Sequence, residues 1–144
     1  MERIKINIPD KVISETQISV RISDINYGNH VGNDSFISMI HETRVQWLQK
    51  NNFTELDIAG VGMIMSDLAI EFKSESFYGD KIFIEMSVGE IAKVGFNLYY
   101  RLSTMRNDAL LILAKAKTAM VCFDYKSRKI VAIPVMLLKI LQPC

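Results

Sequence analysis

The first part of the chain alternates between apolar and polar residues. From about Thr16 to Asp24 every second residue is apolar, which predicts a strand with one buried face. Residues 4–8 alternate in the same way until Pro9 breaks the pattern, which indicates a short edge strand or an extended arm. The chain is therefore expected to begin with extended segments.

A helical period follows this extended region. From Asn33 or Asp34 to about Lys50, apolar residues largely recur at three- and four-residue spacing. Asn33 or Asp34 is suited to cap the start of this helix, and Asn51-Asn52 is expected to end it. The apolar stripe is wide, so we expect a sheet to wrap around the helix.

The remainder of the chain is rich in predicted strands. Alternation and long apolar runs predict a turn at Tyr78-Gly79-Asp80 and a polar turn over 124–129. Residues 135–141 are expected to form a short C-terminal helix or an extended tail. A strand, a long helix and several consecutive strands indicate an α+β fold in one domain over residues 1–144. The predicted later strands cover about 61–73, 82–88, 96–102 and 111–123.

The composition narrows the class of protein. Of the 144 residues, 49% are hydrophobic and 23% are charged, and the formal net charge is +1. This is typical of a folded globular chain rather than a disordered one. No basic tail is present, so we expect neither nucleic acid nor a membrane as a partner. A domain this small has limited interior, so its apolar content indicates burial against another subunit.

The cysteines and histidines do not form a metal-binding pattern. Cys122, Cys144, His30 and His41 lack the spacing of a zinc site, so we expect no metal and no cofactor. Cys122 lies in an apolar run and is expected to be buried. The N-terminal segment lacks the apolar stretch of a signal peptide. Together these features predict a protein of the reducing cytoplasm.

A polar loop lies between the first predicted strand and the long helix. Residues 24–34 read Asp-Ile-Asn-Tyr-Gly-Asn-His-Val-Gly-Asn-Asp, and several of these residue types tolerate left-handed backbone geometry. The loop delivers its polar groups to a helix N-terminus, where backbone N–H groups and the helix dipole favour a polarised carbonyl or an anion. This arrangement predicts a ligand site at the start of the helix.

The same loop and the first part of the helix resemble the signature of the hotdog-fold acyl-CoA thioesterases, the family that includes 4-hydroxybenzoyl-CoA thioesterase. That signature reads roughly Asp-x-Asp-x-x-Gly-His-Val-Asn-Asn, then an aromatic residue, then Glu-x-Arg. The two align without a gap, with three departures: Asn26 for the second Asp, Asn29 for Gly, and Gly32 for the first Asn. The matching positions are Asp24, His30, Val31, Asn33, Phe36, Glu42 and Arg44.

The resemblance implies a central helix wrapped by a curved antiparallel sheet. It also implies hydrolysis of an acyl-CoA or acyl-carrier-protein thioester to a free acid and a thiol. In this family the site lies between two subunits, so a homodimer or homotetramer is expected. By the same resemblance, Asn29, Val31 and Asn33 are expected to meet the thioester at the start of the helix.

The departure at position 26 leaves the catalytic carboxylate open. The family often uses the second Asp as nucleophile or base, and Asn26 can do neither, although it could orient water or donate to an oxyanion. Asp24 and Glu42 are the candidate acids, Asp34 is the other acid nearby, and His30 is a candidate general base. Each also has a structural interpretation: Asp24 could accept backbone N–H bonds, and Glu42 could join an ion-pair network with Arg44.

The missing acid also keeps a second function open. A non-catalytic hotdog protein could bind an acyl thioester or serve as an assembly module, and Asn26 is the best sequence argument for it. A dehydratase is a third alternative. That reaction needs a histidine and an acid facing each other across a dimer.

Overall fold

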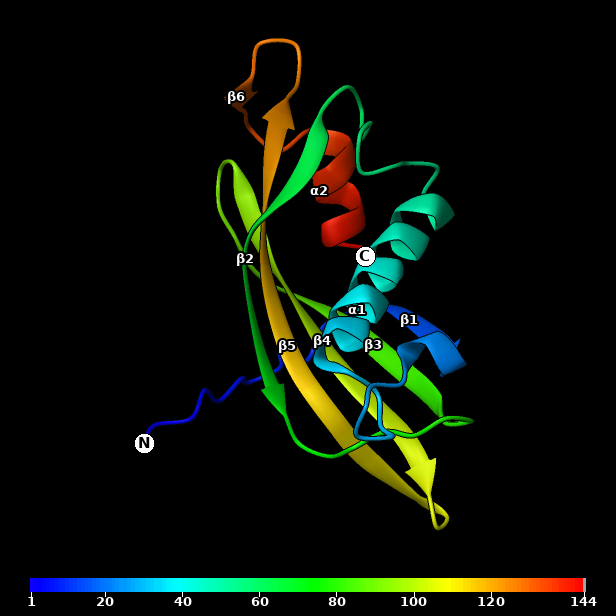
Figure 1. Cartoon of the computed structure of the whole chain (residues 1–144). Coiled ribbons are helices and arrows are strands. Elements are labelled where there is room, and N and C mark those ends of the chain that lie inside the picture. Colours follow the sequence, from blue (N-terminus) through cyan, green and yellow to red (C-terminus); the bar gives the residue numbers. More distant parts are fainter. Residues whose placement is uncertain (144) are drawn as a thin grey trace.

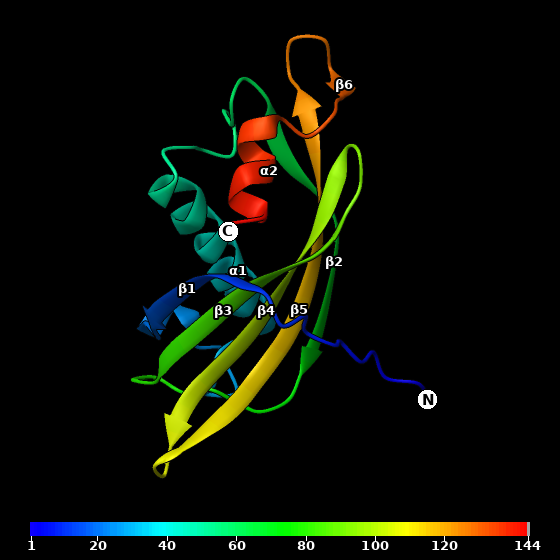
Figure 2. The same cartoon turned by 180° about the vertical axis from the view of Figure 1, so that it is seen from behind.

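The computed structural model describes residues 1–143 (Figure 1). One long helix lies against a curved sheet, and a short helix follows at the C-terminal end on the same side of the sheet (Figures 1 and 2). The elements in chain order are β1 (Val12–Ser19), a single 3-10 turn (Ile22–Asp24), α1 (Asn33–Lys50), β2 (Gly62–Phe72), β3 (Lys81–Ile91), β4 (Gly95–Arg106), β5 (Ala109–Asp124), β6 (Lys129–Ile130) and α2 (Val135–Leu141).

The sheet is antiparallel throughout its described pairings. Its order is β1-β3-β4-β5-β2, and β6 pairs with the last residues of β5. The register places Ile84, Leu102, Ala114 and Phe72 in one row across four strands. Partnered residues of antiparallel strands share a face, so this row covers the inner face of the sheet. Its last member, Phe72, packs against Phe36 in the first turn of α1, with ring centroids 5.9 Å apart.

The core lies between α1 and the concave face of the sheet. Leu98, Tyr100 and Leu102 of β4 are fully buried, and they alternate with residues on the outer face, as a half-solvated sheet requires. The buried face of α1 is wider than its apolar positions, because it also includes Thr43 and Arg44. The apolar residues that α1 buries are Phe36, Met39, Ile40, Trp47 and Leu48.

Most of the predicted architecture is confirmed. The α+β arrangement of one helix wrapped by an antiparallel sheet is present, and α1 has the predicted limits. Residues 135–141 form a helix rather than a tail, and the turn at 78–80 contains Gly79 with a φ of +91°. No helix within residues 1–143 is both long enough and apolar enough to cross a membrane.

Two local predictions are corrected, and the alternative left open for residues 4–8, an edge strand or an arm, is decided in favour of the arm. The first strand ends at Ser19 rather than continuing to Asp24, because the Asp24 N–H donates to the Arg21 carbonyl and bends the chain into a 3-10 turn. The cap of α1 is Gly32, without a side-chain capping bond, rather than Asn33 or Asp34. Residues 1–9 form no strand. They form an arm that crosses the convex face of the sheet from β1 toward β2 (Figure 2).

Candidate active site

The polar loop before α1 is a tight, hydrogen-bonded structure. The Asn26 N–H donates to the His30 carbonyl at 2.9 Å, and the Asn29 N–H donates back to the Asn26 carbonyl at 3.1 Å. Asn29 adopts a φ of 64°, in the left-handed region that glycine and asparagine tolerate best. The family signature has glycine at this position, and Asn29 keeps the left-handed backbone conformation that glycine adopts easily.

The loop is anchored to the connection between β2 and β3. Val31 is buried, and its N–H donates to the Ser76 carbonyl at 2.8 Å. The Ser76 hydroxyl donates to Asp80, whose carboxylate also pairs with Arg106. The N–H of Val31, which was expected to meet the substrate, is therefore already used in holding the loop in place.

The start of α1 presents free donors beside this loop. The N–H groups of Ser35 and Phe36 both reach the Gly32 carbonyl. Those of Asn33 and Asp34 find no acceptor among residues 1–143. They carry the positive end of the helix dipole. Two adjacent free donors of this kind are suited to an oxygen atom that gains negative charge during a reaction.

The side chains of Asn26 and His30 converge over Gly28. A β-carbon placed on Gly28 would lie 3.1 Å from His30 Nε2 and 3.3 Å from Asn26 Oδ1, so the absence of a side chain there leaves room for both. The Nδ1 atom of His30 lies 3.1 Å from the Val31 carbonyl oxygen. A carbonyl only accepts, so this bond places the proton on Nδ1. In the neutral ring, Nε2 is then the unprotonated nitrogen and is available as a base.

A small cavity is lined in part by His30. Its volume is about 210 Å³, and it lies between the start of α1 and the end of β2. The aromatic rings of Phe36 and Phe72 form its apolar wall. Sequence reasoning did not anticipate the residues that the β2–β3 connection contributes, because no local pattern brings that connection to the helix start. The cavity is lined by His30, Val31, Phe36, Phe72, Lys73, Ser74 and Glu75.

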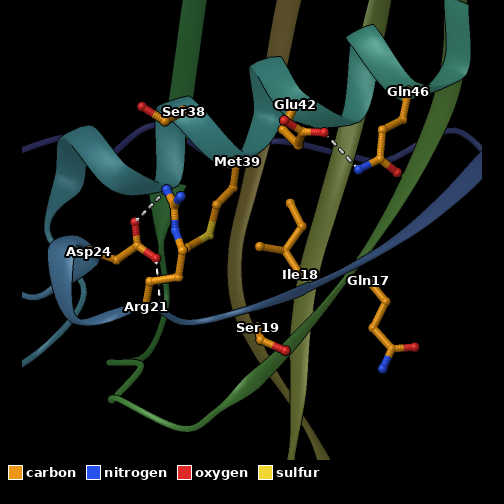
Figure 3. A pocket seen from close by; sticks show the side chains of 9 residues that line it. All are labelled: Gln17, Ile18, Ser19, Arg21, Asp24, Ser38, Met39, Glu42 and Gln46. Carbon is orange, nitrogen blue, oxygen red and sulfur yellow. Dashed lines mark hydrogen bonds and ion pairs between the residues drawn. The ribbon is translucent and has the colours of Figure 1, made fainter. Parts of the chain in front are cut away.

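The side chains of Asp24 and Glu42 line a different cavity, although the Asp24 carbonyl accepts the N–H of Gly32 at 3.0 Å. Both line a cavity of about 370 Å³ between β1 and α1, with Met39 between them (Figure 3). Asp24 is buried, and its carboxylate accepts the Arg21 N–H at 2.8 Å. Glu42 is exposed and accepts a hydrogen bond from Gln46 at 2.7 Å. The structure therefore separates the predicted site residues into two groups: Asn26, Asn29, His30, Val31 and Asn33 at the helix start, and Asp24 and Glu42 beside β1.

The ion pair expected between Glu42 and Arg44 is absent from the described residues, and Arg44 has other partners. Its guanidinium donates to the Tyr100 hydroxyl at 3.3 Å, and its Nε atom lies 3.7 Å from a carboxylate oxygen of Glu55. The Tyr100 hydroxyl is also 2.7 Å from Thr118 Oγ1. Burial raises the pKa of Tyr100, more than the nearby Arg44 charge lowers it. This buried network fixes the middle of α1 on the sheet.

Comparison with known proteins agrees with this geometry. Residues 20–141 match the family model described as the Thioesterase-like superfamily. A 1,4-dihydroxy-2-naphthoyl-CoA hydrolase from Synechocystis sp. is 25% identical over 118 residues, which cover 80% of this chain and 84% of that protein.

Solved structures share the architecture at lower identity. A 1,4-dihydroxy-2-naphthoyl-CoA thioesterase from Synechocystis has a TM-score of 0.79 at 20% identity, over 88% of this chain and 93% of that one. A 4-hydroxybenzoyl CoA thioesterase mutant complexed with 4-hydroxybenzoyl CoA also has a TM-score of 0.79, at 14% identity, over 90% and 98%. The architecture is the hotdog fold. The family match over residues 20–141 goes further: this chain belongs to the thioesterase-like superfamily.

Proposed function

We propose that the protein hydrolyses an acyl thioester of coenzyme A or of an acyl carrier protein to the free acid and the thiol. The observation that carries this proposal is the pair of free N–H groups of Asn33 and Asp34 at the start of α1, in the segment between Val31 and Phe36, which both line the cavity with His30. The named activities of the Synechocystis relative support the same reaction class.

The chemistry follows from these groups. The thioester oxygen accepts from the N–H groups of Asn33 and Asp34, which stabilise the charge that develops when water attacks the carbonyl carbon. The acyl group lies along Phe36 and Phe72, which exclude water from that side of the carbonyl. The Nε2 atom of His30 accepts a hydrogen bond from the attacking water and orients it.

The test is turnover of a panel of acyl-CoAs that includes aliphatic, hydroxybenzoyl and dihydroxynaphthoyl thioesters, measured as released thiol. We expect at least one thioester to be hydrolysed and His30→Ala to lower kcat/KM by about 10²-fold or more with the fold intact. His41→Gln is the matched control, because His41 is the only other histidine and bonds to Glu55 rather than facing the cavity. Equal turnover by the His30→Ala and wild-type proteins would remove His30 from the mechanism.

The competing proposal is a non-catalytic protein that binds an acyl thioester. The specific observation in its favour is Asn26, which provides no carboxylate at the position where the resemblance has one. A folded wild-type protein that binds acyl-CoA but hydrolyses none of the panel would favour this alternative over the hydrolase.

A further inference from the structure

The carboxylate of Asp34 occupies the space that Gly32 leaves beside Asn26. A β-carbon placed on Gly32 would lie only 2.6 Å from Asp34 Oδ1 and 3.5 Å from Asn26 Cβ. Both distances start from the same point, so Asp34 Oδ1 and Asn26 Cβ are at most 6.1 Å apart, the sum of the two. Asn26 and Gly32, which replace an Asp and an Asn of the family signature, thus both lie near the Asp34 carboxylate.

Asp34 also differs from the other acids near the loop in having no partner. Asp24 accepts the Arg21 N–H, and Glu42 accepts from Gln46. Asp80 is held by Ser76 and Arg106. The carboxylate of Asp34 makes no hydrogen bond and no ion pair with any residue from 1 to 143, and it is exposed. It is therefore free to accept a proton from a water molecule.

Asn26 complements this carboxylate. Its Oδ1 atom accepts the Gly28 N–H at 2.9 Å, which identifies the oxygen and leaves the amide nitrogen with two free donors. A neutral amide at position 26 can donate to water or to a carbonyl oxygen, and it does not repel the Asp34 carboxylate. A second aspartate at position 26 would instead place two like charges close together.

We propose that Asp34 is the general base that replaces the carboxylate missing at position 26, an inference that rests on the hydrolase activity proposed above. Asp34 takes one proton from water while the water oxygen bonds to the thioester carbon. The tetrahedral intermediate then collapses, the C–S bond breaks, and its electron pair goes to sulfur. The proton held by Asp34 passes to the leaving thiolate, and the product acid releases its own proton to solvent.

The test compares Asp34→Asn with wild type in steady-state acyl-CoA hydrolysis across pH. Asparagine keeps the shape of the side chain and cannot act as a base. We expect kcat to fall about 10²-fold or more with a smaller change in KM, and the decline of kcat at low pH to disappear. Asp10→Asn is the control, since Asp10 is an exposed aspartate at the far end of β1.

A purely structural role for Asp34 makes a different prediction. An aspartate in the first turn favours the helix dipole, and its loss would lower the melting temperature while leaving the pH profile unchanged. The double variant Asn26→Asp/Asp34→Asn separates the two roles further. It returns the carboxylate to position 26, and we expect it to be at least tenfold faster than Asp34→Asn alone.

The outcomes are distinct. A wild-type protein that hydrolyses acyl-CoA together with an Asp34→Asn variant within threefold of its kcat would overturn this inference and leave the proposed function standing. A large loss of kcat with the low-pH decline intact would also overturn it, as would a double variant no faster than Asp34→Asn. No turnover by folded wild-type protein would overturn both the proposed function and the base.

Discussion

The buried guanidinium of Arg44 depends on Glu55 for its counter-charge, so Glu55→Gln should destabilise the fold. The two side chains are 3.7 Å apart, which is too long for a hydrogen bond, so the interaction is electrostatic. At an effective dielectric constant of about 20, two unit charges at that distance attract by about 4–5 kcal/mol. The Glu55 side chain is 25% exposed and also bonds to His41, so much of this attraction is screened or replaced.

We therefore expect Glu55→Gln to lower the free energy of unfolding by about 2 kcal/mol, between the values typical of exposed and of buried pairs. For a chain of this length this corresponds to a decrease in Tm of about 4–8 °C. Urea denaturation monitored by circular dichroism measures it. The control is the same substitution in an Arg44→Met background, where no buried guanidinium remains and the cost should fall below about 0.5 kcal/mol. An equal cost in both backgrounds would refute the reasoning.

Three further predictions concern other parts of the chain. Gly32→Ala should lower acyl-CoA turnover several-fold, because the β-carbon of the new alanine displaces the Asp34 carboxylate. The change in Tm should be less than about 3 °C, and an unchanged kcat/KM would contradict the prediction. Burial raises the pKa of Cys122 to about 11, so its thiol is almost entirely protonated at pH 8. In a Cys144→Ser variant, alkylation of Cys122 should therefore be slow until denaturant is added, and rapid labelling of the folded protein would contradict this prediction. Among the described strands only β5 pairs with β2, so the other edge of β2 is open. We predict that this edge of β2 lies in a dimer or tetramer interface, and sedimentation showing a stable monomer at micromolar concentration would exclude such an interface.

The main elements could be predicted because their periodicity is strong. The spacing in residues 33–50 and the alternation in the later strands identified α1 and β2 to β5 with small errors at their ends. The first strand was extended too far because Val20 and Ile22 continue its alternation into the 3-10 turn. The hydrogen bonds between Asp24 and Arg21 close a turn without changing the alternation of apolar and polar residues. The alternation alone therefore could not show where the strand ends.

The candidate site could be predicted only in part for a similar reason. The loop signature pointed to the start of α1, where Asn26, His30 and Asn33 do lie together. It could not show that Glu42 lies beside β1, because that depends on how α1 is rotated on the sheet. The partner of Arg44 was missed as well. Glu55 lies in the turn region after the helix, and only the three-dimensional fold brings it to the guanidinium.

The position of a bound thioester tests the central claim most directly. A crystal structure with a non-hydrolysable acyl-CoA analogue should place the carbonyl oxygen within about 3.2 Å of the Asn33 and Asp34 backbone nitrogens, the range of an ordinary N–H···O bond. The Asp34 carboxylate should face the carbonyl carbon across a water molecule. A carbonyl bound instead between β1 and α1, beside Glu42 and away from the start of the helix, would contradict the account.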